Sequence, residues 1–494
     1  MSKHNSIFML LALGVLFTLQ SCNLGGDNFD FSPEALDKKA NEMREQIRNS
    51  STAIDLGKMN NIYYVASNGD DANDGLSAES PIKSLEKVNS LALQSGDCIL
   101  FRRGDTWRGQ IKAKSGVTYS AYSKGSKPNI YGSPCDAAKK GEWVETDAKN
   151  VYVYNYELPN DIGTLVFNHG EACAFKVMMI RQEDGTTLHI DTKEPFASYK
   201  DLSRDLEFYH DYKEAKRIYL YSEKGNPAQR FESIELLTKG HIVQACSDIH
   251  IDNLCLKYCG SHGIGSGTAN NLTVTNCELG WIGGSIQSEN IFGRNFPTRY
   301  GNAIEIYGAC ENYVVTNCYV YQVYDAAITH QHQGDVDHTL VMRNILYSNN
   351  LIEDCVYSIE YFLAGEKTNQ SHYMENILIS NNLMRRSGYG WGKQRPDKET
   401  PAHIKSWSGH INHASNFVIA NNIFDRGTHD LLNIVAKQPE WLPFMSNNVY
   451  IQHLNAKAGS MGHEARSYDF NQTTEGVLKE LFGEENATII FAEE

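Results

Sequence analysis

Residues 301–330 read GNAIEIYGACENYVVTNCYVYQVYDAAITH, and residues 345–361 read ILYSNNLIEDCVYSIEY. Two kinds of short segment alternate in this stretch. One kind is an apolar-alternating strand that ends in Asn-Cys or Asn-Asn, and the other is a small-residue strand with one polar residue, as in AIEI, AITH and SIEY. We interpret the first kind as the stacked scaffold of a repeat fold and the second kind as one functional face of that scaffold.

The Asn-ended segment recurs from about residue 241 to about residue 455. Its copies end at Asn253, Asn276, Asn317, Asn349, Asn381, Asn421 and Asn447. The intervals are irregular because loops of different lengths interrupt the repeat. Asn tolerates the left-handed backbone conformation, and its side chain can hydrogen-bond to the next coil as a ladder. This pattern predicts an all-β parallel β-helix rather than a leucine-rich or propeller repeat.

The small-residue strands place polar residues on one surface when they are aligned on their central apolar residue. The aligned residues are Ile264, Ile304, Ile328, Ile359, Ile404 and Leu432. Because side chains alternate along a strand, an inward central residue turns both of its neighbours outward. One predicted outward column holds Glu305, Thr329, Glu360, Lys405 and Asn433, and the other, mostly small, holds Ala303, Ala327, Ser358, His403 and Leu431. Long insertions flank these strands, as they do at the binding face of a solenoid.

Three acids of this surface, Glu305, Glu360 and Asp325, form the candidate catalytic site. Coils stack about 4.8 Å apart, which puts Glu305 and Glu360 about 10 Å apart at the backbone. Inclined side chains can bring their carboxyls to the roughly 6.5–9.5 Å of an inverting glycosidase, and Asp325 could pair with either acid at a shorter distance. Since neighbouring carboxylates raise one another's pKa, we expect Asp325 or Glu360 as general acid and Glu305 as base or nucleophile. The alternative is that all three are ordinary solvated acids.

A second set of residues is expected to bind the substrate. It comprises Lys405, His330, His332, His403, Trp281, Trp407, Arg299 and Asn433. The aromatic rings could stack on sugars, or they could serve only in packing. The basic residues also permit another reaction, in which Lys405 abstracts the proton α to a uronate carboxylate during β-elimination; otherwise Lys405 only pairs with Glu360. We predict no metal site and no cofactor for hydrolysis, and calcium only for elimination, because a lone His-x-His pair is a weak metal signal.

The N-terminus is predicted to be a targeting segment. Lys3 and His4 precede the apolar run IFMLLALGVLF, which is too short to span a membrane, and LQSC follows at 19–22. The segment resembles a bacterial lipoprotein signal. The resemblance implies cleavage before Cys22, lipidation of its thiol and anchoring in the outer membrane of the cell envelope, on its periplasmic or outer side. An ordinary secretory signal or anchor is the alternative.

Composition and local patterns give the organisation of the chain. The net charge of −15 does not suggest a nucleic-acid partner. The ten cysteines after Cys22 are expected to be buried thiols, with Cys277 and Cys318 at equivalent places in the repeat. We divide the chain into a signal peptide (1–21), a tether with a short helix from Ser32 to Ile47 (22–60), a cap and first coils (61–135), an inserted β-rich subdomain (136–240), the β-helix core (241–455) and a C-terminal cap or tail (456–494).

Several motifs resemble a known group of proteins. YYVASNGDDANDGLSAESPIKSL (63–85) and GDCILFRRGDTW (96–107) resemble the N-terminal cap of exported right-handed parallel β-helix proteins of the pectin-lyase-like fold. GWIGGS (280–285), RYGNAIEIYG (299–308) and VYDAAITHQ (323–331) are similar to exported β-helix glycan-degrading proteins of gut-type bacteria, above all their hydrolase-like members. The resemblance implies catalytic acid roles at Asp325, Glu305 and Glu360 and a polysaccharide or oligosaccharide substrate. A glycoside hydrolase is expected, with a polysaccharide lyase or a non-catalytic glycan-binding lipoprotein as alternatives.

Overall fold

The computed structural model describes residues 30–52, 54–140, 142–289, 296–334, 336–365, 371–395 and 400–493. The predicted signal peptide and the lipidation residue Cys22 lie outside the described residues, so the lipid anchor stays a prediction. Within the described part, the chain has no helix long and apolar enough to cross a membrane.

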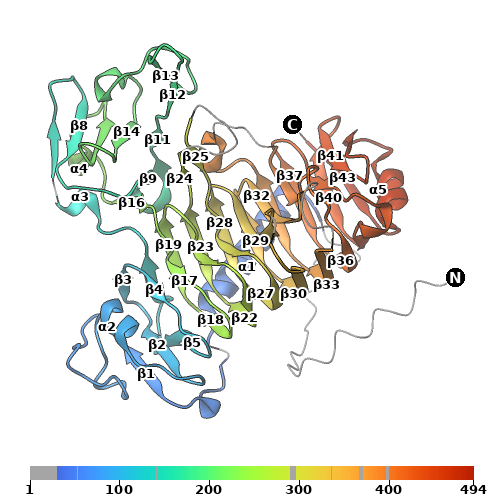
Figure 1. The fold of residues 1–494 in the computed structure, drawn as a ribbon, viewed down its shortest axis with the longest axis horizontal. Coiled ribbons are helices and arrows are strands. Elements are labelled where there is room, and N and C mark those ends of the chain that lie inside the picture. The colour runs from blue at the N-terminus through green and yellow to red at the C-terminus, as the bar shows by residue number, and fades with distance from the viewer. Residues whose placement is uncertain are drawn as a thin grey trace.

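Three long sheets run through the molecule, and the chain visits them in turn (Figure 1). Sheet A follows the order β1 (Ile62–Val65), β2 (Cys98–Arg102), β5 (Thr118–Tyr122), β18 (Ile249–Asp252), β22 (Leu272–Thr275), β27 (Cys310–Thr316), β30 (Val341–Ser348), β33 (Tyr373–Ser380), β36 (Ala414–Ala420) and β39 (Phe444–Ser446), with β21 (Ala269–Asn270) also paired to β27. Its neighbours pair in parallel. Successive coils therefore lie one above the other, and the predicted parallel β-solenoid is confirmed.

Sheets B and C follow the same course. Sheet B runs through β10 (Ala172–Cys173), β9 (Ile162–Phe167), β16 (Ile234–Thr238), β19 (Cys255–Cys259), β23 (Glu278–Ile282), β28 (Tyr319–Val323), β31 (Leu351–Glu353), β34 (Leu383–Ser387), β37 (Ile423–Gly427), β40 (Val449–His453) and β43 (Thr488–Ala492), with β3 (Thr106–Arg108) and β6 (Asn129–Tyr131) beside β19. Sheet C runs through β4 (Ile111–Lys112), β17 (Val243–Gln244), β20 (Ile264–Ser266), β26 (Ile304–Tyr307), β29 (Ala326–His332), β32 (Tyr357–Leu363), β35 (Ala402–Lys405), β38 (Leu432–Ile434), β41 (Lys457–Met461) and β42 (Arg466–Asp469). Sheet C carries the candidate site.

Helices are few and short apart from the first. They are α1 (Pro33–Asn49), α2 (Leu85–Ser90), α3 (Ala137–Lys140), α4 (Pro227–Arg230) and α5 (Thr474–Phe482), with single turns at η2 (Leu56–Lys58), η3 (Asn168–Gly170), η4 (Tyr199–Asp201), η5 (Trp391–Gln394) and η6 (Pro439–Trp441). The interior between the sheets is one continuous apolar core that includes the central residues of the small-residue strands. Their inward orientation is as predicted.

Asparagines hold the coils together at the turns. All seven asparagines predicted from the repeat have a positive φ, from 54° at Asn276 to 61° at Asn253. The longest buried side-chain ladder is instead formed by the second Asn of each doublet, Asn350, Asn382, Asn422 and Asn448, with Nδ2 donating to the next Oδ1 at 2.9–3.0 Å. Glu484 ends this ladder by accepting from Asn448 Nδ2 at 2.9 Å. In earlier coils the buried residues Cys277 and Cys318 occupy the position of the second Asn of the doublet. Each cysteine of the described part is a free thiol.

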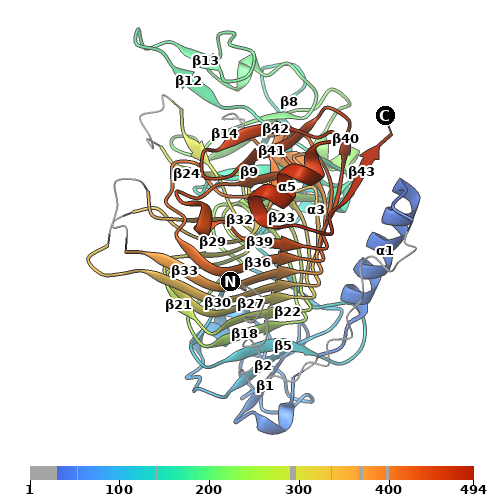
Figure 2. The ribbon, with the colours of Figure 1, turned by 90° about the vertical axis from the view of Figure 1, so that its right-hand side faces the viewer.

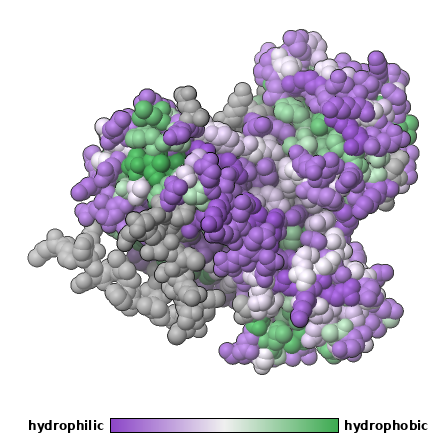
Figure 3. All heavy atoms as spheres, turned by 180° about the vertical axis from the view of Figure 1, so that it is seen from behind, coloured by the Kyte–Doolittle hydropathy of each residue, from purple (hydrophilic) through white to green (hydrophobic). Residues whose placement is uncertain are grey.

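Helix α1 lies along the outer face of sheet B, as the end-on view shows (Figure 2). Ser32 caps it as predicted, with its Oγ accepting from the amide of Ala35. Leu36, Ala40 and Ile47 pack on outward apolar residues of sheet B, while exposed charged and polar residues of α1 contribute to the hydrophilic centre of the back face (Figure 3). The predicted short helix of the tether is thus an integral part of the solenoid.

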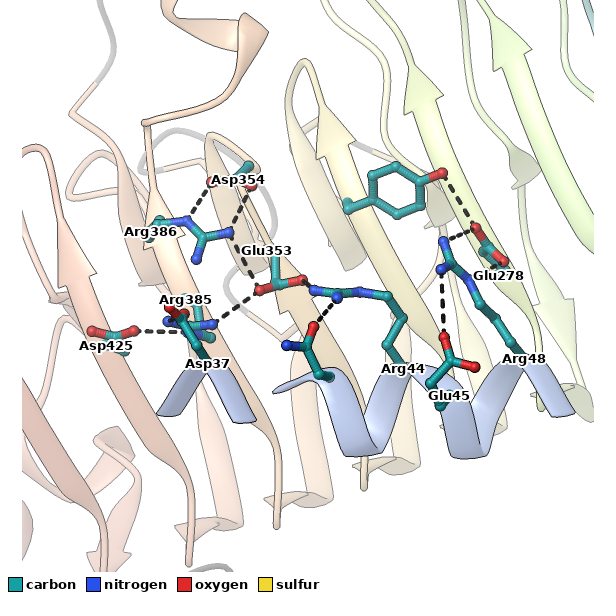
Figure 4. Close-up of polar contacts among 12 residues, drawn as sticks. Asp37, Arg44, Glu45, Arg48, Glu278, Glu353, Asp354, Arg385, Arg386 and Asp425 are labelled. Atoms are coloured by element: carbon teal, nitrogen blue, oxygen red, sulfur yellow. Dashed lines mark hydrogen bonds and ion pairs between the residues drawn. The ribbon is translucent and has the colours of Figure 1, made fainter. Parts of the chain in front are cut away.

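Ion pairs join α1 to several coils (Figure 4). Arg48 binds Glu278 at 3.0 Å and Arg44 binds Glu353 at 2.7 Å. Arg385, fully buried, donates to Asp37 of the helix at 2.7 Å and to Asp425 at 2.8 Å. Because Glu278, Glu353 and Arg385 lie on different strands of sheet B, the helix ties separate coils into one unit.

A second β-rich part lies within the predicted insertion. Its main sheet has the order β11 (Phe175–Lys176), β14 (Glu207–Asp211), β15 (Arg217–Tyr221), β8 (Val151–Tyr154) and β7 (Trp143–Glu145), and β12 (Met179–Arg181) pairs with β13 (Thr187–His189). Two strands from the same range, β9 and β16, extend sheet B. Buried Lys176 donates to both carboxylate oxygens of Asp161, and Asp161 also accepts from the amide of Ile286 at 2.6 Å. The insertion is therefore attached to the loop beside the candidate site.

Replacing Arg385 by Met should destabilise the protein strongly. The change leaves Glu353 and Asp425 buried with fewer partners, and breaking a buried ion pair from one side costs about 3–5 kcal/mol. We expect a melting temperature lower by several degrees. The matched control is Lys38→Met, which removes an exposed pair with Glu42 at 4.0 Å and should have almost no effect. Equal melting temperatures for the two variants would contradict this account of α1.

Candidate active site

The predicted column of outward residues is present on sheet C. Register pairs join Glu305 to Thr329, Thr329 to Glu360, Glu360 to Lys405 and Lys405 to Asn433. The two glutamates are thus two coils apart, as expected. All members are largely buried: Glu305 is 7% exposed and Glu360 is 4% exposed. These acids are therefore not the ordinary solvated residues of the alternative interpretation.

Polar side chains surround the carboxyl group of Glu305. Asn302 donates from Nδ2 to its Oε2, and Gln331 Nε2 approaches the same oxygen at 3.4 Å. His262 Nδ1 lies 3.2 Å from this oxygen and accepts the backbone amide of Asn302 at 3.0 Å. Burial raises the pKa of Glu305 to about 8; the hydrogen bond from Asn302 opposes the rise and the charge of Asp325 adds to it.

Asp325 lies between the two glutamates, in the turn between β28 and β29. It is 6% exposed, and Arg395 Nη1 contacts its Oδ1 at 2.5 Å. Its charge contributes to the raised pKa of both Glu305 and Glu360 and counters the lowering that burial imposes on the pKa of His262. Asp325 is therefore electrostatically close to each of the other polar groups of the site.

Glu360 has an aromatic and basic surrounding. Trp407 donates from Nε1 to its Oε1 at 2.6 Å. Lys405 Nζ lies 4.3 Å from the centre of the Trp407 ring and donates to Thr400 Oγ1 at 2.8 Å. Burial, followed by the charge of Asp325, raises the pKa of Glu360 to about 8, against the hydrogen bond from Trp407 and the charges of Arg395 and Lys405. Lys405 and Trp407 are thus placed at the site, as predicted, together with Asn433.

The second predicted outward column is wrong. Ala303, Ala327 and Leu431 belong to the interior core, and the ladder between β29 and β32 skips the pair Ala327/Ser358. The chain bends there, so two successive residues face inward. His403 is consequently fully buried, with Nδ1 at 3.0 Å from Ser358 Oγ and Nε2 at 3.1 Å from the carbonyl of Arg426. It has no place in substrate binding.

Two further histidines lie away from the acids. His330 has the same inward parity as Ile328; it is fully buried, and its Nδ1 lies 2.9 Å from the hydroxyl of Tyr347 in the core. The prediction that it binds substrate is wrong. His332 lies at the end of β29 with its ring 5.1 Å from that of Tyr307. It stands beside the acid column rather than in it.

Arg299 and Trp281 are buried and contact other parts of the protein. Arg299 donates to the carbonyls of Gly284 and Gly163, which fastens the hairpin of β24 (Ile286–Ser288) and β25 (Thr298–Arg299) to strand β9. Trp281 is buried in an apolar cluster with Trp391 and Tyr324. These side chains are occupied between the coils and the insertion, and their predicted contacts with substrate stay predictions.

Four residues described above at the acids were not predicted: His262, Asn302, Gln331 and Arg395. His262 and Asn302 both come two residues before an aligned central isoleucine. Extending the alignment by two positions would have shown them. Arg395 follows η5 in a loop with no equivalent in other coils, so no repeat signal could have placed it.

A metal site is not apparent in the described part of the chain, where no group of three or more His, Cys, Asp or Glu side chains could hold an ion. The calcium expected for elimination remains an untested prediction. The basic residues expected to assist Lys405 are not gathered around it, since His330, His403 and Arg299 are buried elsewhere.

Comparisons with known proteins give distant structural likeness. No protein-family model matches the chain, and no curated protein matches it. Among solved structures, one described as XylC with xylose has a TM-score of 0.44 and 13% identity, covering 83% of this chain and 73% of that one. A GH136 lacto-N-biosidase from Eubacterium ramulus gives 0.32 and 13%, covering 85% and 66%, and a rhamnogalacturonan lyase gives 0.30 and 11%, covering 79% and 74%. At these TM-scores, none of them bears on the activity of this chain.

The raised pKa of Glu360 predicts a pH-dependent cost to stability. Its pKa is about 8 in the folded protein and 4.5 without the fold. The folded state therefore holds an extra proton between these values, and its stability falls as pH rises from about 5 to about 8. In Glu360→Gln, whose amide oxygen can still accept from Trp407, this loss is removed.

We expect the melting temperature of Glu360→Gln, relative to wild type, to rise by a few degrees between pH 5 and pH 9. Glu232→Gln, at an exposed position, is the matched control and should follow wild type. Parallel pH curves for Glu360→Gln and wild type would show that Glu360 is not protonated at neutral pH.

Proposed function

We propose that this protein is a glycoside hydrolase that acts on a complex carbohydrate through Asp325 and Glu305. One observation carries the proposal: three carboxyl groups converge on one outward face, where one is ion-paired with an arginine and two have a strongly raised pKa. Carboxyl groups whose environments differ in this way are what acid–base cleavage of a glycosidic bond requires. A protein that only binds glycans gains nothing from burying two acids at this cost.

The ion pair divides the roles between the acids. Arg395 provides a counter-charge to Asp325, which favours its carboxylate as the nucleophile. Both glutamates are protonated near neutral pH, so they suit the acid role better than the base role that an inverting pair would demand of one of them. Asp325 lies on the coil between the two glutamates, four positions before Thr329, their shared register partner. Its charge acts on both glutamates, and we propose that its carboxyl and that of Glu305 form a retaining pair, which requires a separation of roughly 5–5.5 Å.

His262 favours Glu305 as the general acid. Because His262 Nδ1 accepts the amide of Asn302, this nitrogen carries no proton. Burial also lowers the pKa of His262 to about 4, which keeps the ring neutral. This neutral ring, 3.2 Å from Glu305 Oε2, offers neither a proton nor a positive charge to a Glu305 carboxylate, which favours the protonated form of Glu305. The role expected for Glu305 from the sequence, base or nucleophile, is thus exchanged with that of Asp325.

The reaction then has two steps. The Asp325 carboxylate attacks the anomeric carbon while Glu305 gives its proton to the departing glycosidic oxygen, which leaves a glycosyl ester on Asp325. The Glu305 carboxylate next takes a proton from water, whose oxygen attacks the anomeric carbon and releases Asp325 as a carboxylate. The first step leaves Glu305 as a carboxylate and Asp325 as an ester, and the second step restores the proton on Glu305 and the carboxylate on Asp325. Glu360, Lys405, Trp407 and Asn433 are proposed to bind sugar hydroxyls beside the reacting carbon.

The winding of the solenoid is also inferred. Crossover connections between parallel strands of one sheet are right-handed in about 98% of cases. We therefore assign the right-handed β-helix expected from the motifs of the cap. The elimination reaction has less support, because three basic residues expected to assist Lys405 are buried with other partners, namely His330, His403 and Arg299.

Leaving-group dependence separates the roles of the acids. Glu305→Gln should lose at least 1,000-fold in kcat/KM on an oligosaccharide but much less on a dinitrophenyl glycoside, whose leaving group needs no proton. Asp325→Asn should lose activity equally on both substrates, since the nucleophile is needed for each. Asn433→Ala, at the edge of the column, serves as the mild comparison. If Glu360→Gln shows the selective loss instead of Glu305→Gln, the assignment of the acid is wrong; if all three acid variants cleave normally, the proposed function fails.

A further inference from the structure

An exposed tyrosine stands beside the acid column without a role in the chemistry. Tyr307 is the last residue of β26 and follows Glu305 by two positions, so both side chains leave the same face of the strand, about 6.6 Å apart at the backbone. Its register partners in the next coils are Gln331 and then Phe362. Tyr307 is 41% exposed, whereas Gln331 is 7% and Phe362 is 8% exposed. An aromatic side chain is thus left open at one point of an otherwise buried column.

The Tyr307 ring is held in place from the following coil. The His332 ring lies 5.1 Å from it at an interplanar angle of 49°. A ring packed against another ring along one side loses less conformational freedom when a ligand binds to it than an unpacked ring does. Tyr307 is therefore better suited to recognition than a freely rotating surface side chain.

The preceding coil leaves space next to this ring. Strands β20 and β26 pair Gly265 with Glu305 and Ser266 with Ile306, which brings Gly267 opposite Tyr307. A side chain placed at Gly267 would meet no other atom within 4 Å. The position beside Tyr307 is open, in contrast to Gly265, where a side chain would approach the ring of His241 and the Cβ of His262. The structure thus combines a fixed aromatic ring with a vacant neighbouring position.

We propose that Tyr307, supported by His332, is a stacking platform for the sugar unit next to the one that reacts at Asp325. The inference rests on the proposed function and adds a substrate class to it: oligosaccharides of two or more pyranose units, in which the unit at Tyr307 presents an apolar C–H face to the ring. Glu305 and Tyr307 are separated along strand β26. The substrate therefore lies parallel to this strand at this point, perpendicular to the solenoid axis.

The test compares two substrates of the same sugar. A monosaccharide glycosyl fluoride occupies only the reacting position, while the matching oligosaccharide also reaches the platform. We expect Tyr307→Ala to lower the ratio of kcat/KM for the oligosaccharide to kcat/KM for the fluoride by at least tenfold, mainly through KM of the oligosaccharide. Tyr307→Phe keeps the ring and should retain most of the ratio, and His332→Ala should lower it by a smaller factor.

Two controls separate the loss of the platform from nonspecific effects of the substitution. Tyr156→Ala removes a similarly exposed tyrosine of the insertion, 39% exposed, and should leave the ratio as in wild type. Melting temperatures show whether Tyr307→Ala is folded, and Tyr307→Phe tests the platform independently of that. An unaltered ratio in Tyr307→Ala, while wild type still hydrolyses the oligosaccharide, overturns the platform but not the function.

Failure of the function is recognised separately. If wild type cleaves none of a panel of glycosyl fluorides and neutral oligosaccharides, the hydrolase proposal fails. The platform is then judged from calorimetric binding of the same oligosaccharides to wild type and Tyr307→Ala: at least tenfold weaker binding to the variant supports it, and equal binding or no binding to wild type contradicts it.

Discussion

Parallel pairing of successive coils is the constraint on which the other features of this protein depend. The pairing fixes a register in which Glu305, Thr329 and Glu360 lie in one column, with Asp325 in the turn of the middle coil. Groups distant in sequence are thereby held on adjacent coils or two coils apart by the paired strands themselves. The chemistry follows from this spacing, because charges this close in a buried place cannot all ionise together.

Burial of the two glutamates lowers the stability of the folded protein, and interactions elsewhere in the fold offset this loss. Two glutamates with pKa values of about 8 disfavour folding at neutral pH. Against this stand the buried ladder from Asn350 to Asn448, ended by Glu484, and the helix α1, whose arginines pair with acids of several coils. The Asn ladder and the ion pairs of α1 therefore stabilise the solenoid away from the acids, while the buried glutamates of sheet C destabilise it.

Much of this arrangement could be predicted from the sequence, and the failures have physical causes. Period-two alternation and recurrent Asn identified the coils, the inward isoleucines and the acid column, because these depend on local backbone geometry. The alternation rule failed at Ala327 and His403, near the starts of their strands, where the pairing ladder of sheet C skips a residue and the side chain is buried. Arg395 was missed because it comes from a loop, and the docking of α1 because its partner acids, such as Glu353, are distant in sequence.

The central claim is that the Asp325 carboxylate attacks the sugar from one coil away, rather than that two glutamates act across two coils. It is tested most directly by proton NMR of the first product formed by the wild-type enzyme, recorded before the sugar mutarotates. The account predicts that the anomeric configuration of the substrate is retained, as required by a glycosyl ester on Asp325. A first product of inverted configuration would contradict it and would return the catalytic pair to Glu305 and Glu360.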